Sequence, residues 1–306
     1  MTSSSESLNA NKAPFSINTL LIIAVFLQIT WGLVPSASKM VIEEIPVELY
    51  VALRWTLSGF IFVMYLTLTK SWVRISKTDF LCVGGLGLLG YGLASLGTLY
   101  GLKIGGVSNF ALLSALGPVV ISTVSILILK ERPNRWFYIA LPLCVSGLVL
   151  LVMGKYQVST LQIAGYSALS VLAGYTMEAI VFVFSKRFKA KMPIAQYLGV
   201  AQIAAAAIFW LLQATYFGQA DQFHQLTGRG LLAALFVAIV ACVLCYAVLY
   251  WLLSYLDGHK LALFDGIHAV SASVFGYFLF QEPMTTLMLI GGGLIFSGLI
   301  IGTIKK

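Results

Sequence analysis

Charge is scarce in this sequence. Only 10% of its 306 residues are Asp, Glu, Lys or Arg, whereas soluble domains carry roughly 25%. Hydrophobic residues make up 59% of the chain, and a soluble core cannot bury such a share. Apolar runs of 18 or more residues recur along the whole length, and each can cross a hydrocarbon layer about 30 Å thick as a helix. We therefore expect a polytopic membrane protein.

Cysteines and recognisable catalytic motifs are also scarce. The four cysteines all lie inside apolar runs, where neither a disulfide framework nor a zinc site is expected: Cys82, Cys144, Cys242 and Cys245. Cys242 and Cys245 form a CysXXCys pair without a second pair, so we interpret them as packing residues. No GXXXXGLys loop for ATP and no GXSXG nucleophile turn is present. We expect no metal, no cofactor and no direct use of ATP.

Ten apolar spans can be placed along the chain, at 19–38, 47–69, 80–102, 107–129, 136–154, 160–184, 194–217, 230–254, 259–280 and 284–304. The connections between them are short and hold most of the charged residues, because lipid-exposed backbone groups must be satisfied inside helices. No room is left for a soluble domain. Residues 1–18 are polar and Ser-rich and lack the apolar core of a cleaved signal peptide, so we expect a disordered cytoplasmic tail.

The net charge of +8 is spread over these connections, which argues against a nucleic-acid partner. If the N-terminus is inside the cell, the inner connections and termini carry fourteen Lys and Arg residues and the outer ones carry four. Inner loops of membrane proteins are enriched in Lys and Arg. We therefore predict a multi-pass protein of the cell membrane with both termini cytoplasmic.

The second half of the chain repeats the first. Several residues between Leu102 and Leu148 are identical to those found 151 positions further on, without a gap, and Glu131 and Glu282 are one such pair. This repetition implies two copies of one multi-helix unit, which we place at 19–155 and 156–306. Five spans per copy is an odd number, so the second copy must enter the membrane inverted. The predicted fold is an all-α membrane protein with ten transmembrane helices in two inverted five-helix repeats, an architecture of transporters.

Short motifs add a family resemblance. They are TrpGly at 31–32, GluGluIlePro at 43–46, AlaLeuArg at 52–54, Pro118 followed by LysGluArgPro at 130–133, and GlnGluPro at 281–283. Together they resemble the drug/metabolite transporter superfamily, specifically its ten-helix EamA-type branch. The resemblance covers essentially the whole chain after the tail. One departure is Ala269, which stands where the first half has Pro118.

The resemblance also implies a function. Proteins of this kind move small polar metabolites, often amino acids, out of bacterial cells, by proton exchange or by facilitated diffusion. It therefore implies a bacterial inner membrane, a small polar organic substrate, and protons as a second partner if transport is coupled. Ten helices suffice for an internal site, so we expect a monomer or a loose homodimer in the lipid bilayer.

Asp265 and His268 are polar residues within a predicted span. Asp265 lies seven residues beyond Gly258, which is about 10 Å into the membrane on a helix, and His268 follows on the same face. An ionised carboxylate facing lipid costs at least about 2.5 kcal/mol, so Asp265 should face a cavity or a partner. One alternative is a substrate or proton site in which His268 adjusts Asp265. The other is a structural Asp–His pair. Ser114 occupies the same depth in the first copy, 151 positions earlier.

Two further charged residues lie within predicted spans. Glu178 shares a helix face with Tyr175 and Phe182, so it either carries a proton among aromatic rings or reaches the cytoplasmic rim and pairs with a base there. Arg54 either clamps a substrate carboxylate or pairs with an acid at the outer rim, among Glu43, Glu44 and Glu48. Trp31 and Tyr175 lie at comparable places in the two halves and are candidate cavity walls.

Glu131 and Glu282 each precede a proline at a predicted helix start. A carboxylate in the first turn complements the positive end of the helix, so we interpret both as architectural. A gating role is the alternative. Lys39, at the end of the first span, is expected at the membrane rim.

These features predict a secondary transporter in which two halves alternate around a midplane cavity. We expect an exporter of small polar metabolites, such as amino acids or related compounds, with proton coupling and facilitated diffusion both open. A multidrug or cation exporter, or a facilitative carrier, of the same fold is the alternative. An intramembrane enzyme is disfavoured, because its candidate groups all lie on one helix, whereas catalytic groups normally need separate supports: Asp265, His268, Ser271 and Ser273. We therefore expect no enzyme activity and no catalytic residue.

Overall fold

The computed structural model describes residues 15–114, 116–129, 136–155, 161–185, 188, 191–252, 255, 265–282 and 284–303. All regular elements among these residues are helices, and no strand occurs among them. In chain order the elements are α2 (Ile17–Gly32), α3 (Val34–Ile42), α4 (Val47–Leu68), α5 (Lys77–Gly87), η1 (Leu88–Leu93), α6 (Ala94–Ser114), α7 (Gly117–Leu129), α8 (Phe137–Lys155), α9 (Leu161–Ser185), α10 (Ile194–Leu212), η3 (Gln213–Phe217), η4 (Ala220–Gln225), α11 (Gly228–Leu235), η5 (Phe236–Cys245), α12 (Tyr246–Leu252), α14 (Asp265–Phe280) and α15 (Thr286–Thr303).

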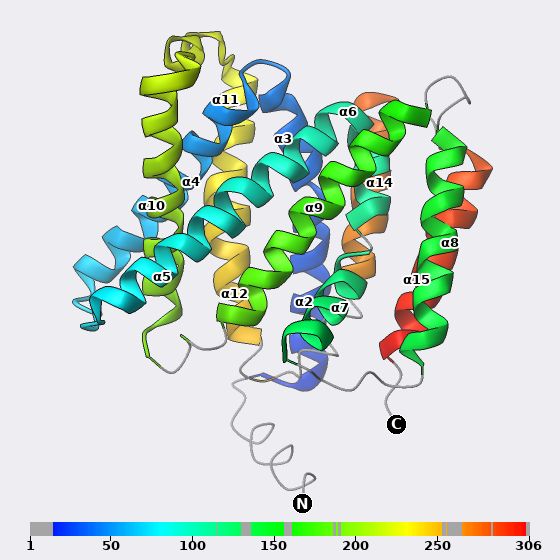
Figure 1. Cartoon of the computed structure of the whole chain (residues 1–306), viewed down its shortest axis with the longest axis horizontal. Helices are drawn as coiled ribbons and strands as arrows, with labels where there is room; N and C mark the ends of the chain where they lie inside the picture. Colours follow the sequence, from blue (N-terminus) through cyan, green and yellow to red (C-terminus); the bar gives the residue numbers. More distant parts are fainter. Residues whose placement is uncertain are drawn as a thin grey trace, which may run out of the picture.

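The helices run back and forth between the two ends of one bundle (Figure 1). α2 begins and α15 ends at the same end, which we call the termini end; the turn between α3 and α4 lies at the opposite end. Six helical stretches of the described residues are long and apolar enough to span a membrane: Ile17–Ile42, Val47–Leu68, Lys77–Ala111, Gly165–Ser185, Ile194–Phe217 and Gly228–Leu249. Shorter apolar helices accompany them, at Tyr138–Gly147, Ile267–Phe280 and Thr286–Gly298. The all-helical membrane architecture is confirmed, and the number of ten spans stays a prediction.

Corresponding helices of the two halves start in the same way. Pro46 precedes α4 and Pro193 precedes α10, with φ of −57° at both prolines and ψ of 145° and 146°. Proline has a fixed φ and no N–H, and the first N–H groups of a helix have no partner within it, so proline suits this place. The spans predicted to start at 47 and 194 therefore begin at these residues in the structure.

The first predicted span, at 19–38, lies within the helical stretch Ile17–Ile42, which a single residue, Leu33, divides into α2 and α3. α2 ends at Gly32 and α3 restarts at Val34, one residue before Pro35. A proline inside a helix removes one backbone hydrogen bond and crowds the preceding turn, so the chain restarts where proline is tolerated.

The predicted span at 107–129 is also broken. It is divided between the end of α6 and α7, which restarts at Gly117. α6 itself is kinked at Gly106, where φ is 76° and ψ is 173°. Glycine adopts this backbone conformation without the strain that a side chain would add, and the kink falls in the connection predicted between the spans at 80–102 and 107–129.

The two halves share one core. Its largest cluster of buried side chains includes Trp55 and Phe62 from α4 and Leu198 and Phe209 from α10. Each of these four side chains is at most 6% exposed. The contact between α4 and α10 therefore joins the two halves within this core.

α8 and α15 pack through corresponding residues. Gly147 in α8 and Gly298 in α15 are related by the shift of 151 positions, and each packs against the helix that carries the other. Their partners correspond by the same shift: Gly291 and Ile295 face Gly147, and Ala140 and Cys144 face Gly298. Reciprocal contacts of this kind are those of a two-fold axis. Because the two helices are antiparallel, this axis is perpendicular to them, which is the geometry that an inverted repeat requires.

This packing predicts that replacing glycine by alanine lowers Tm at Gly147 but not at Gly293. In Gly147→Ala, the new methyl group meets the Gly291 carbonyl oxygen at 2.5 Å. We expect its Tm in detergent to fall by about 2 to 8 °C, because overpacking costs about 1–3 kcal/mol. Gly293→Ala in α15 is the matched control, because its methyl group meets no atom within 4 Å and alanine favours the helix. Equal losses of Tm in both variants would contradict the contact between α8 and α15.

Candidate functional site

Arg54 lies inside the bundle and joins side chains from several helices. Its Nε donates a hydrogen bond to Cys242 Sγ in η5 at 3.2 Å, and its guanidinium carbon lies 4.4 Å from the centre of the Trp55 ring. Tyr246 of α12 and Glu178 of α9 lie within electrostatic range of the guanidinium group. We call Arg54, Trp55, Glu178, Cys242 and Tyr246 the Arg54 cluster. It combines residues from both halves of the chain.

The alternative that Arg54 pairs with acids at the rim is wrong, because its side chain is directed to Cys242. Two of the candidate acids have other partners. Glu44 accepts hydrogen bonds from the backbone N–H and the hydroxyl of Thr227, at 2.8 and 2.7 Å, and Glu48 accepts one from the hydroxyl of Tyr100.

The terminal nitrogens of Arg54 are available. Cys242 engages only Nε, and no described residue accepts a hydrogen bond from the two terminal nitrogens. The residue is partly buried, so these nitrogens are not fully sealed in protein. They form a planar fork that matches the two oxygens of a carboxylate. Arg54 can therefore hold a carboxylate without losing its bond to Cys242.

Glu178 supplies the opposite charge in the cluster. Its side chain is exposed, and its charge interacts with that of Arg54. No ion pair within 4 Å joins it to Arg54 among the described residues, so the two charges interact at longer range. The alternative partners at the rim, Lys186 and Arg187, lie outside the described residues. A ligand whose carboxylate binds Arg54 can place a cationic group near the carboxylate of Glu178.

Aromatic rings border the cluster. Trp31 of α2 packs edge to face against Tyr246, with ring centres 5.7 Å apart. Tyr175 precedes Glu178 by one helical turn, and its ring lies 6.4 Å from that of Phe110. The structure thus brings Trp31 to the cluster through Tyr246, and Tyr175 through its place beside Glu178 on α9.

α14 carries the remaining candidates. It begins at Asp265, whose side chain lies outside the described residues. α14 packs against α2, where a Cβ at Gly32 would collide with Ser271, next to Trp31. His268 lies one turn nearer the termini end and is partly buried, and its ring has no hydrogen-bond partner among the described residues.

Ser114 is not brought into the Arg54 cluster. Its hydroxyl donates a hydrogen bond to the Ala111 carbonyl within α6 at 2.6 Å, and the residue is 7% exposed. Ser114 corresponds to Asp265 by the shift of 151 positions, but this correspondence does not bring a free hydroxyl to the cluster.

Cys242 packs in the main core cluster, as we expected, but sequence reasoning missed its hydrogen bond with Arg54. Cys242 lies in η5, a π-helix of ten residues, and Tyr246 follows directly after this helix. π-helical turns are rare and occur frequently at functional sites. No spacing in the sequence identifies Arg54, 188 positions away, as the partner of Cys242.

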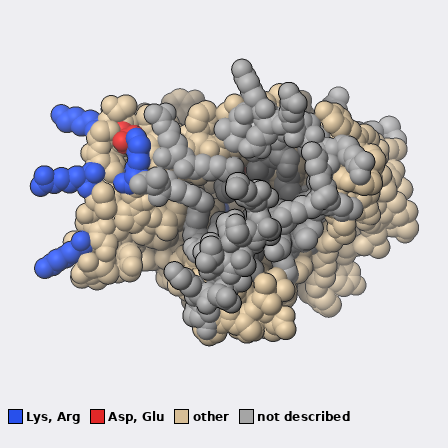
Figure 2. Space-filling view, turned by 90° about the horizontal axis from the view of Figure 1, so that it is seen from below, with Lys and Arg blue, Asp and Glu red and all other residues tan. Residues whose placement is uncertain are grey.

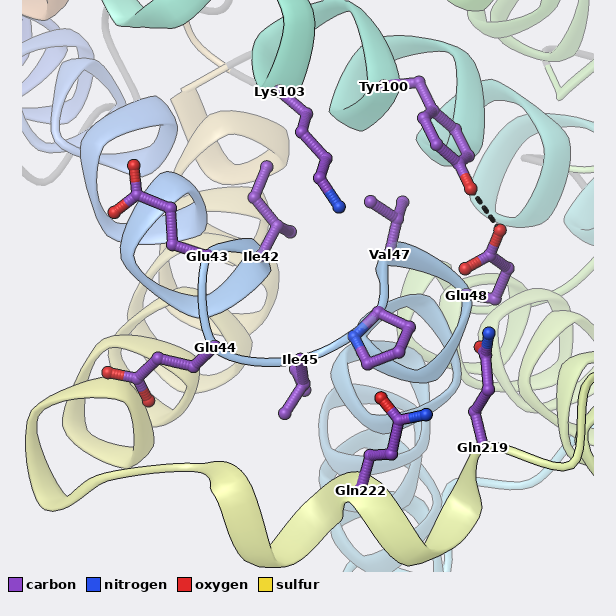
Figure 3. A pocket seen from close by; sticks show the side chains of 11 residues that line it. Ile42, Glu43, Glu44, Ile45, Val47, Glu48, Tyr100, Lys103, Gln219 and Gln222 are labelled. Atoms are coloured by element: carbon purple, nitrogen blue, oxygen red, sulfur yellow. Dashed lines mark hydrogen bonds between the residues drawn. The ribbon is translucent and has the colours of Figure 1, made fainter.

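A separate cavity of about 340 Å³ lies at the opposite end, beside the turn between α3 and α4 (Figure 3). Glu43, Glu44 and Glu48 line it together with Lys103 and Tyr100, and the hydroxyl of Tyr100 binds Glu48. This cavity contains none of the predicted site residues. No group of three or more His, Cys, Asp or Glu able to hold a metal occurs in the described part of the chain.

Comparison with known proteins identifies the family. The family model of EamA-like transporters matches residues 18–153 and again residues 165–304, so the two matches cover nearly the whole chain. The chain belongs to the EamA-like transporter family. It is therefore a membrane transporter of the drug/metabolite transporter superfamily, as its motifs predicted.

Individual relatives of this EamA-like transporter agree. It is 22% identical to the uncharacterized transporter YetK of Bacillus subtilis, over 88% of this chain and 82% of that protein. It is 28% identical to an uncharacterized transporter of Archaeoglobus fulgidus, over 64% of this chain and 66% of that protein. A solved structure described as "Crystal structure of protein" has the same fold, with a TM-score of 0.63 and 17% identity, covering 93% of this chain and 98% of that one.

The bond between Arg54 and Cys242 predicts a difference between two neighbouring cysteines. Cys242→Ala removes the acceptor of a buried, charged N–H, which costs about 1–3 kcal/mol, so we expect Tm to fall by about 2 to 8 °C. Cys245→Ala is the control, because Cys245 is also buried and has no described hydrogen bond. Cys242→Ser retains an acceptor and should recover part of the loss. If Cys242→Ala and Cys245→Ala melt at the same temperature, Cys242 does not support Arg54.

Proposed function

We propose that this EamA-like transporter is a secondary carrier that exports small carboxylate-bearing metabolites, amino acids or related zwitterions, across a bacterial inner membrane. The observation that carries this proposal is Arg54, whose terminal nitrogens donate to no described partner and whose charge lies within electrostatic range of Glu178. The substrate carboxylate binds the guanidinium fork through two charge-assisted hydrogen bonds. The substrate amino group binds the carboxylate of Glu178. Trp31 and Tyr175 border the bound substrate.

A carrier of cationic drugs is the competing function, and the charges of the cluster disfavour it. The guanidinium of Arg54 already covers the face of Trp55, so this ring is not free to hold a cationic ligand. A cation placed beside Glu178 would also be repelled by Arg54. A zwitterion satisfies both charges at once.

The arrangement of the helices supports transport by alternating access. The Arg54 cluster takes Arg54 from the first half and Glu178, Cys242 and Tyr246 from the second. Substrate sites of transporters with inverted repeats lie at such an interface between the repeats. The reciprocal contact of α8 and α15 supports the proposal that the ten helices form two inverted five-helix halves. These halves rock against each other around the cluster, within a single chain.

The distribution of basic residues supports cytoplasmic termini. Figure 2, viewed onto the termini end, shows Lys and Arg gathered at one edge, over the connection between α4 and α5. The described basic residues of this region include Lys70, Arg74, Lys77 and Lys191. Basic residues accumulate on the cytoplasmic side of membrane proteins. We therefore propose that the termini end faces the cytoplasm.

Transport by wild-type protein and Arg54 variants in proteoliposomes tests the proposed substrate class. We expect counterflow of a pool of radiolabelled L-amino acids and no transport of ethidium. Arg54→Lys retains the charge but loses the fork, so amino-acid transport should fall about 10- to 100-fold. Arg229→Lys, at an exposed site, is the matched control and should transport like wild type. Ethidium transport in wild type, or full amino-acid transport by Arg54→Lys, would contradict the proposal.

Glu178 is the proposed proton carrier, because it is the carboxylate of the cluster. If it exchanges a proton for substrate, Glu178→Gln should abolish accumulation driven by a pH gradient. Exchange of labelled for unlabelled amino acid should persist, because a glutamine oxygen still accepts a hydrogen bond from an amino group. The control is Glu43→Gln, in the separate cavity at the opposite end. Gradient-driven accumulation by Glu178→Gln at the wild-type level would assign coupling to another residue or exclude it.

A further inference from the structure

Glu282 connects the second half to the first at the end of the bundle opposite the termini. Its Oε1 accepts hydrogen bonds from Lys39 Nζ at 2.7 Å and from the Val107 N–H at 2.8 Å, and its Oε2 accepts one from the Ser108 N–H at 2.7 Å. We call Lys39, Val107, Ser108 and Glu282 the Glu282 latch. The side chains of Lys39 and Glu282 are only 18% and 9% exposed.

The kink at Gly106 makes the latch possible. The positive φ of Gly106 interrupts α6, so the N–H groups of Val107 and Ser108 are free to bind a side chain. The positive end of the following helical segment favours a carboxylate. A Cβ at Gly106 would lie 2.6 Å from Glu282 Oε1, so only glycine leaves room for this carboxylate.

Glu282 therefore does not act as its sequence suggested. We expected it to complement the start of its own following helix, whereas it binds a helical segment 175 positions earlier. Lys39, which we expected at the rim, is held in the same latch, and its ammonium lies 4.3 Å from the centre of the Phe280 ring. Its counterpart Glu131 lies outside the described residues. The latch joins the two stretches matched by the family model, residues 18–153 and 165–304.

The seam below the latch contains polar atoms without partners. α3, α6 and α14 contact each other here, side by side at the opposite end (Figure 1). The hydroxyls of Ser36 and Ser108 are buried, and neither accepts or donates a hydrogen bond in the structure. Ser36 lies one turn before Lys39 on α3, and a Cβ at Gly276 of α14 would lie 2.9 Å from Ser108 Oγ. Buried polar groups are nearly always paired, so these orphaned atoms add a free-energy cost to the closed seam.

We propose that the Glu282 latch is the gate of the transport pathway at the end opposite the termini, which is the extracytoplasmic end in the proposed orientation. This inference rests on the proposed alternating access. Breaking the latch separates α14 from α3 and α6, and water then reaches the orphaned hydroxyls. The latch stabilises the closed seam, whereas the buried polar atoms without hydrogen-bond partners destabilise it. A seam with these opposing contributions can adopt both a closed and an open state.

A thiol-accessibility experiment tests the gate without requiring a known substrate. Ser36→Cys places a reporter beneath the latch, and the wild-type chain with its own cysteines gives the background. A membrane-impermeant methanethiosulfonate is added to right-side-out and to inside-out membrane vesicles. Adding Glu282→Gln or Lys39→Met to the reporter should raise its labelling rate at least tenfold in right-side-out vesicles. Lys39→Met retains the carboxylate on Val107 and Ser108, so it breaks the latch while preserving the start of the helical segment.

The control breaks a different ion pair of the same length. Lys191 and Asp79 are also 2.7 Å apart, but lie at the termini end, so Asp79→Asn should leave the labelling of Ser36→Cys unchanged. The Tm of every variant is measured to separate gating from unfolding. Unchanged labelling in both latch variants, a rise only in inside-out vesicles, or an equal rise with Asp79→Asn overturns the proposed gate. The gate and the substrate class are tested separately. If the labelling rate rises tenfold but the Arg54→Lys variant transports amino acids normally, the gate is retained and the substrate assignment is refuted.

Discussion

The low dielectric interior of a membrane protein governs this structure, because a charge buried there must find a partner on another helix. Arg54 binds Cys242 and lies within electrostatic range of Glu178, and Lys39 binds Glu282. Each of these contacts crosses from one half of the chain to the other. The few charges that the hydrophobic sequence retains within its spans are therefore used where the two halves meet, and there they couple the position of one half to that of the other.

The two sets of contacts, the Arg54 cluster and the Glu282 latch, suit different steps of transport. At the centre, the Arg54 cluster leaves a cationic fork and a carboxylate available to a ligand. At the end, the Glu282 latch satisfies every one of its charged groups but leaves hydroxyls beneath it without partners. The first arrangement suits binding, and the second suits opening and closing. Close glycine contacts elsewhere, such as that between α8 and α15, let helices of different halves pack tightly without polar side chains.

Much of the fold could be predicted because hydrophobic spans, loop charges and the shift of 151 positions are local or periodic signals. The family followed from short motifs for the same reason. The kink at Gly106 falls in a predicted connection, whereas the short interruptions before Pro35 and before Gly117 were missed, because single residues decide them within otherwise apolar runs. Arg54 and Glu178 could be singled out as intramembrane charges, but their partners could not be assigned. The partners of Cys242 and Glu282 were missed because each lies more than 170 positions away, and no sequence pattern records that proximity.

The central claim is that the two halves move relative to each other at the seam that Glu282 closes. Pulsed electron–electron double resonance measures that movement most directly. The spin labels are placed at Glu43 and Gln281, which are both exposed and lie on opposite sides of this seam. We predict two populated distances in lipid bilayers, with the longer one enriched when Glu282→Gln is introduced. A single distance that is the same with and without this substitution would contradict the account.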